Sequence, residues 1–210
     1  MYLLQEFDKQ VQRLVQNGYP RIVGISESEF IKLFEPLRAK VEKLGLPDSD
    51  FEKGYLPFVI VLRSDLIPTD KAMSLVEKEG KTGITKLFPH DPTDFKTISE
   101  VKVPDSNVYL LIEIDRGKDS INQPPSEAMK RIVESVRSPL TIDEGVAIVT
   151  HYPEFLTKNN CFSLLASRHT GDQRIPAIWI NANKNPNLGW CWNGNPHTWL
   201  GSASCKERIC

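Results

Sequence analysis

Apolar side chains recur at helical spacing through the first quarter of the chain. Residues 2–17 place an apolar side chain every three or four positions, which predicts an amphipathic helix. A second apolar stripe over residues 30–44 follows Ser26-Glu27-Ser28-Glu29, a capping box that predicts the start of a helix. Pro36 interrupts this stripe, so we expect a kink or two abutting helices there. Residues 1–50 therefore form a helical N-terminal part in this interpretation.

The middle of the chain carries two strand patterns, a continuous apolar run and a second, mainly apolar segment. Residues 56–62 and 108–115 are rich in β-branched side chains, which is typical of buried strands. Residues 80–106 mix Gly, Pro, Asp and Thr and are expected to be rich in loops. Helices are predicted at 69–79, at 126–137 and, behind the capping box Thr141-Ile142-Asp143-Glu144, at 141–151.

From Cys161 onward the pattern changes to short strands joined by short polar turns. Strands are predicted at 162–167, 177–181, 188–192 and 198–202. Connections this short favour antiparallel neighbours. The predicted fold class is therefore α+β, with N-terminal helices and a mixed or antiparallel sheet that ends in a C-terminal antiparallel meander. No repeat or long linker divides the chain, so residues 1–210 are expected to form one domain.

Residues 189–201 hold three of the four tryptophans, and they carry the leading functional hypothesis. Aromatic walls with a few placed polar groups are the usual anatomy of a small-ligand pocket, and the partner predicted here is a small polar or planar molecule. The candidate ligand-binding residues are Trp190, Trp192, Asn193, Asn195, His197 and Trp199, with Arg168 and His169 from a neighbouring turn. The alternative is a structural or interaction module in which the indoles belong to the core.

A second functional hypothesis is an enzyme that uses Cys191 or Cys205 with His197. A thiol nucleophile needs an imidazole within hydrogen-bond reach and a group that orients it. In a strand, Cys191 points away from the face that Trp190 and Trp192 share, so it either packs inward or faces a cleft. The Cys and His spacings match no zinc finger, and neither a metal site nor a cofactor is predicted.

Among these residues His197 is the strongest single candidate. It follows Asn195-Pro196, and the fixed φ of proline aims the next side chain in one direction. Imidazole titrates near neutrality and can donate, accept or ligate. The competing interpretation is a histidine that is hydrogen-bonded within its own turn.

Charge and targeting signals exclude several classes of protein. The formal net charge is −1, so the chain lacks the excess of positive charge that is typical of proteins that bind nucleic acid or an anionic membrane. The N-terminus lacks a signal-peptide pattern, and no window approaches the roughly 18 apolar residues of a membrane span. Four scattered cysteines are too few for a disulfide scaffold. A cytoplasmic protein is expected by elimination.

Several blocks between residues 55 and 205 resemble, in order, those of an uncharacterised bacterial family of unknown function. They include Ser138-Pro139-Leu140-Thr141-Ile142-Asp143-Glu144-Gly145 and the segment from Leu188-Gly189-Trp190-Cys191-Trp192 to Gly201. The resemblance implies a bacterial cytoplasmic protein. It implies no activity and no catalytic residue.

Overall fold

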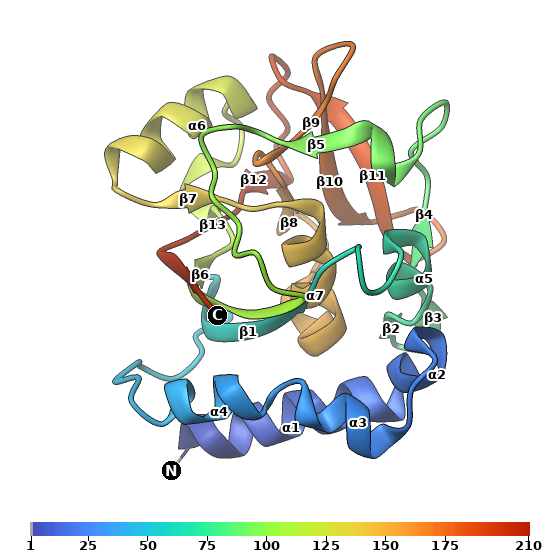
Figure 1. The fold of residues 1–210 in the computed structure, drawn as a ribbon. Coiled ribbons are helices and arrows are strands. Elements are labelled where there is room, and N and C mark those ends of the chain that lie inside the picture. The colour runs from blue at the N-terminus through green and yellow to red at the C-terminus, as the bar shows by residue number, and fades with distance from the viewer. Residues whose placement is uncertain (1) are drawn as a thin grey trace.

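The computed structural model describes residues 2–210, in which the N-terminal helices form a layer below two five-stranded β-sheets (Figure 1). The helices are α1 (Tyr2–Gln16), α2 (Tyr19–Val23), α3 (Glu27–Lys32), α4 (Glu35–Val41), α5 (Thr69–Ser74), α6 (Pro125–Glu134) and α7 (Ile142–His151), with short 3₁₀ turns at Pro92–Asp94, Lys118–Ser120 and Pro153–Phe155. The strands are β1 (Tyr55–Leu62), β2 (Glu77–Lys78), β3 (Lys81–Thr82), β4 (Ile84–Thr85), β5 (Phe95–Thr97), β6 (Val108–Asp115), β7 (Ser138–Pro139), β8 (Cys161–Ser163), β9 (Ser167–His169), β10 (Arg174–Ile180), β11 (Pro186–Trp192), β12 (Leu200–Ser202), β13 (Ser204–Cys205) and β14 (Glu207–Ile209).

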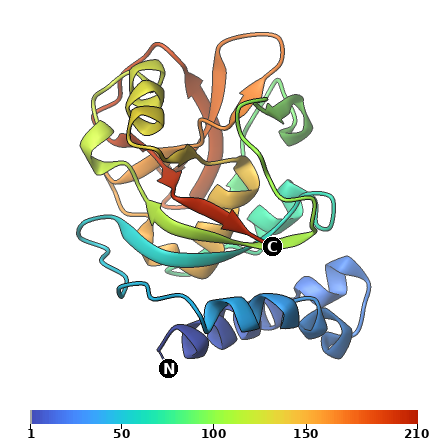
Figure 2. The same cartoon turned by 60° about the vertical axis from the view of Figure 1, so that its left-hand side comes forward.

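The N-terminal helices follow the sequence pattern closely. The capping box at Ser26 is present, with the Glu29 amide donating to Ser26 Oγ and the Ser26 amide donating to the Glu29 carboxylate. The predicted long helix is two helices, because α3 ends at Lys32 and Pro36 lies in the first turn of α4. Figure 2 shows these four helices as a separate layer, and their buried apolar side chains join one hydrophobic cluster with both sheets.

A buried glutamine connects this layer to the edge strand of the first sheet. Gln10 of α1 accepts a hydrogen bond from the Ile60 amide at 2.8 Å and donates to the Phe58 carbonyl at 3.3 Å. Both partners belong to β1, which has a paired neighbour, β6, on one side only. The side chain therefore satisfies backbone groups that an edge strand would otherwise leave without partners.

The first sheet has the order β1-β6-β13-β7, with β14 also paired to β6. A buried ion pair connects the C-terminal strand β14 to α7. It joins Arg208 to Glu144, whose side chains are 6% and 0% exposed. Glu144 also accepts from Tyr109 of β6 and completes the capping box at Thr141. One carboxylate thus ties together the helix, the sheet and the C-terminal strand.

The second sheet has the order β12-β8-β10-β11-β4. The strands β8, β10 and β11 form the predicted antiparallel meander. The strand predicted at 198–202 departs from it, because β12 pairs with β8 in parallel. At the opposite edge β4 pairs in parallel with β11, so the sheet is mixed.

Two predicted elements are wrong in extent. The helix predicted at 69–79 ends at Ser74, and β2 and β3 form a hairpin with a two-residue turn at Glu79 and Gly80. Both turn residues have positive φ, as such a turn requires, so Gly80 closes a hairpin and not a helix. The strand predicted at 162–167 is split into β8 and β9, and β9 turns away to pair with β5.

Candidate functional site

The tryptophan-rich segment places two of its indoles around an arginine. Trp190 and Trp192 lie on the same face of β11, with ring centroids 5.3 Å apart. Arg174 is the cross-strand partner of Trp192, and its guanidinium carbon lies 4.4 Å from the centroid of Trp190 and 4.8 Å from that of Trp192. The expected shared face is therefore present, and its centre holds a cation stacked against two aromatic rings.

Two histidines and an aspartate surround the free end of this arginine. Arg174 Nη1 donates to His90 Nε2 at 2.7 Å and also contacts the carboxylate of Asp172. The rings of His90 and His169 stack with centroids 3.9 Å apart, and Phe95 packs edge-on against both. We call His90, His169, Asp172 and Arg174 the histidine cluster.

Three further residues proposed for the pocket, Arg168, Asn193 and Asn195, lie in neighbouring segments. Arg168 Nη1 donates to the side-chain oxygen of Asn193 at 2.8 Å, which confirms that the 168–174 turn lies beside the tryptophan segment. Asn195 is exposed, and its amide donates to the Trp192 carbonyl at 3.1 Å. Asn193 thus ties two turns together, while Asn195 closes its own turn.

The other two aromatic residues of the segment, His197 and Trp199, have different packing partners. Trp199 packs edge-to-face on Trp179, with centroids 5.9 Å apart, and His197 lies against Trp199 at 5.3 Å. Residues alternate between faces along a strand, so Trp179 lies on the opposite face of β10 from Arg174. A single platform of three tryptophans is therefore wrong. His197 Nε2 is buried and has no hydrogen-bond partner among residues 2–210, and burial lowers the pKa of His197.

The thiols proposed as nucleophiles are buried. Cys191 lies on the face opposite Trp190, as expected, and its sulfur is 3.7 Å from Ser163 Oγ. Burial raises the pKa of Cys191 to about 11 and that of Cys205 to about 12, so both stay protonated at neutral pH. Within the described residues neither sulfur forms a hydrogen bond with His197. Neither thiol thus has the imidazole partner or the lowered pKa that favours a thiolate nucleophile.

His90 also lines an open groove of about 1100 Å³. It is lined by residues 64–65, 68–70, 85–93 and 95–97, and so lies between the start of α5 and the segment from β4 to β5. Strand pairing holds this wall at both ends, because β4 pairs with β11 of the second sheet and β5 pairs with β9 in a separate two-stranded sheet (Figure 1). Trp190 Nε1 also donates to the Phe88 carbonyl at 3.2 Å. The tryptophan strand thus positions the groove without lining it.

The carboxylate of Asp143 lies next to this groove. A smaller hollow of about 60 Å³ shares Ser64, Thr69 and Thr97 with the groove and is also lined by Asp143. The carboxylate of Asp143 accepts from the Ser64 amide at 2.9 Å and from the Ser64 hydroxyl at 3.1 Å. Burial raises the pKa of Asp143, and the hydrogen bonds from Ser64 only partly offset it. A carboxyl with a raised pKa beside a cleft is typical of functional sites.

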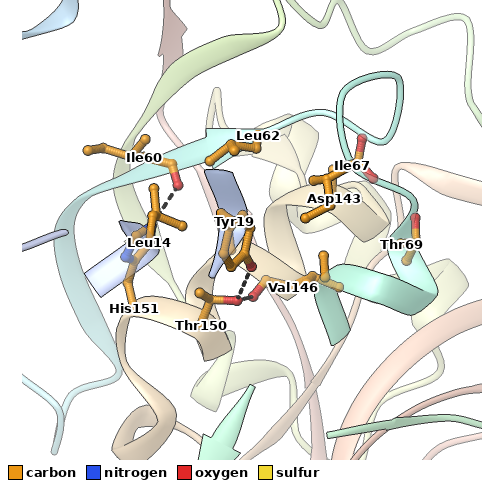
Figure 3. A pocket seen from close by; sticks show the side chains of 12 residues that line it. Leu14, Tyr19, Ile60, Leu62, Ile67, Thr69, Asp143, Val146, Thr150 and His151 are labelled. Atoms are coloured by element: carbon orange, nitrogen blue, oxygen red, sulfur yellow. Dashed lines mark hydrogen bonds between the residues drawn. The ribbon is translucent and has the colours of Figure 1, made fainter. Parts of the chain in front are cut away.

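Asp143 also lines a second hollow (Figure 3). It measures about 20 Å³, which is room for one water molecule and not for a ligand. Tyr19 and Thr150 are hydrogen-bonded at 3.2 Å along it, and His151 Nε2 lies 3.0 Å from the Ile60 carbonyl. We interpret this hollow as a packing defect between the N-terminal helices and α7.

Several candidate residues were missed by sequence reasoning. His90 and Asp172 belong to no motif, and strand pairing brings them together from positions 82 residues apart in the sequence. For Arg174 the sequence suggests an anion contact or a solvated charge, and neither predicts a place between two indoles. Asp143 lies in the first turn of a helix, where the helix dipole favours a negative charge, so its sequence position does not mark it as functional. No local signal identifies the groove, because its walls come from loop-rich segments.

The chain was compared with known proteins and families. Within residues 2–210 no helix is long and apolar enough to cross a membrane. No curated protein and no solved structure matches the chain. A sequence profile described as a family of unknown function, DUF5701, matches residues 13–210. The chain therefore belongs to this family of unknown function.

Proposed function

We propose that the protein binds a small polar ligand in the groove between residues 64–70 and 85–97. The observation that carries this proposal is the groove itself, which at about 1100 Å³ is as large as the ligand pockets of proteins. This location replaces the tryptophan segment as the binding surface. The segment keeps a supporting role, because β11 and Trp190 hold the wall that carries His90.

The lining indicates the class of ligand. Five hydroxyl side chains reach the groove, from Ser64, Thr69, Thr85, Thr93 and Thr97. Three aspartates and two lysines also line it, so the two signs of charge nearly cancel. Phe88 is 87% exposed at the rim and offers an apolar face. Hydroxyl groups beside an aromatic ring suit a hydroxylated and nearly neutral molecule better than a strongly charged one.

The test is ligand-observed NMR with a panel of neutral polyols and sugars, phosphorylated sugars and amino acids. Thr97 is exposed and lines both the groove and the smaller hollow, so Thr97→Trp should fill the groove without disturbing the core. Ser99→Trp is the matched control, because Ser99 is exposed two residues further along and lies outside the lining. We expect binding of neutral hydroxylated compounds that Thr97→Trp abolishes and Ser99→Trp retains. Equal binding by the two variants would refute the proposal.

A further inference from the structure

Three potential metal-binding side chains converge in the histidine cluster. Ligand atoms of His90, His169 and Asp172 all lie within 4.8 Å of one another. Ligands around a tetrahedral zinc ion with bonds of about 2.0–2.1 Å are about 3.4 Å apart, so the three groups need to approach by little more than about 1 Å. Two imidazoles and a carboxylate are ligands that first-row transition ions accept.

In each imidazole of the cluster, one ring nitrogen accepts a hydrogen bond from a neighbouring donor. A guanidinium is only a donor, so His90 Nε2 must accept from Arg174 and its proton must be on Nδ1. His90 Nδ1 lies 3.9 Å from the carboxylate of Asp94, which is longer than a hydrogen bond. His169 Nδ1 accepts from the Gly171 amide at 3.2 Å. A ring nitrogen with a free lone pair is the group through which an imidazole binds a metal.

Arg174 satisfies this set of acceptors only in part. It contacts His90 and Asp172, but it makes no hydrogen bond to His169, whose Nδ1 lies 3.1 Å from Asp172 Oδ1. These two atoms take main-chain donors instead: the Gly171 amide donates to His169 Nδ1 at 3.2 Å, and the Arg174 amide donates to Asp172 Oδ1 at 2.8 Å. The arginine in turn leaves its own Nε buried and without a partner among the described residues. A metal ion would engage all three acceptors at once.

We propose that His90, His169 and Asp172 bind a divalent transition-metal ion at the end of the groove, and that Arg174 competes with the ion for this position. Three protein ligands leave at least one coordination position free. Because His90 also lines the groove, the ion would lie next to the space where a ligand would bind. The ion then adds a Lewis acid to the groove, while the tryptophan pair holds the displaced guanidinium.

The test measures Zn²⁺ binding by isothermal titration calorimetry and the absorption spectrum of bound Co²⁺, with no groove ligand present. All proteins carry Cys210→Ser, because Cys210 is the exposed cysteine of the chain and could bind metal by itself. His90→Gln and His169→Gln remove single ligands, and His197→Gln is the matched control outside the cluster. Arg174→Met removes the competing charge and keeps an apolar chain between the indoles; Arg174→Gln replaces it if that variant does not fold.

We expect the parent protein to bind one Zn²⁺, and either histidine substitution in the cluster to weaken binding by more than about 100-fold, since even supporting residues contribute about 10–100-fold. Removal of the arginine charge should tighten binding by at least about tenfold, because a cation in contact repels the ion. The Co²⁺ complex should show no thiolate charge-transfer band. Binding that is absent from both the parent and the arginine variant, or unchanged by the substitutions at His90 and His169, overturns the proposal. Since no groove ligand is involved, this proposal and the proposed function can fail separately.

Discussion

Acidification should destabilise the protein through one buried histidine. His151 at the end of α7 is 1% exposed. Its Nε2 is 3.0 Å from the Ile60 carbonyl, and its Nδ1 has no partner among the described residues. Burial, with repulsion from Arg13, lowers the pKa of His151 to about 3. The folded protein therefore holds this imidazole neutral at every pH above that value.

The sign and size of the effect follow from proton linkage. Unfolding returns the pKa of His151 to about 6.5, so between pH 6.5 and pH 3 the unfolded state binds a proton that the folded state does not. The free energy of unfolding therefore falls as the pH falls below 6.5. From pH 7 to pH 5 the loss is about 2 kcal/mol for this group alone. The size of this loss is set by the pKa of His151 in the unfolded state, as long as its pKa in the folded state remains below about 4.

The assay is urea denaturation at pH 7, 6 and 5 for the parent protein and for His151→Gln. Glutamine keeps a donor for the Ile60 carbonyl but does not titrate, so the variant should lose stability at pH 7 and show a weaker pH dependence. The other titratable groups are present in both proteins and cancel in the comparison. A difference in pH dependence of less than about 0.5 kcal/mol between the two proteins would refute the assignment of a neutral buried histidine.

Three further predictions concern stability and are checked by chemical denaturation. Gln10→Leu should lower the free energy of unfolding by about 2–3 kcal/mol, because it leaves backbone groups of β1 buried without partners, whereas Gln5→Leu on the exposed side of α1 should change it little. Arg208→Met should cost about 3–5 kcal/mol, since it leaves the carboxylate of Glu144 buried and unpaired, and adding Glu144→Gln should recover part of this loss. Asp143→Asn should stabilise the protein at pH 7, because burial raises the pKa of Asp143 and its ionised form therefore carries a cost that an amide avoids. The gain should shrink toward pH 4, where the carboxyl becomes protonated, and a loss of stability at pH 7 would contradict this reasoning.

Local patterns in the sequence predicted the elements that local physics determines. The two capping boxes and the apolar stripes located α1, α3, α4 and α7, and the two strand patterns located β1 and β6. Alternation along β11 correctly placed Trp190 and Trp192 on one face and Cys191 on the other. Each of these features depends on residues within a few positions of one another.

The candidate site depends on pairings that local patterns do not specify. Three of the four residues of the histidine cluster come from the 169–174 turn, but His90 joins them only because β5 pairs with β9 and β4 pairs with β11. The same pairings build the groove from a segment that the sequence marks only as rich in loops. Trp199 was grouped with Trp190 because the two are close in sequence, yet the parallel pairing of β12 takes it to another face.

The most direct test of the proposed function is to map where a ligand binds. With the tightest compound from the NMR panel, amide chemical-shift changes should concentrate in residues 64–70 and 85–97 and include Asp143, whose carboxylate borders the adjoining hollow. Residues 193–199 should change little, because they lie outside the lining of the groove. Shifts concentrated in residues 193–199, with none at residues 64–70 and 85–97, would contradict the proposed function and return the binding surface to the tryptophan-rich segment.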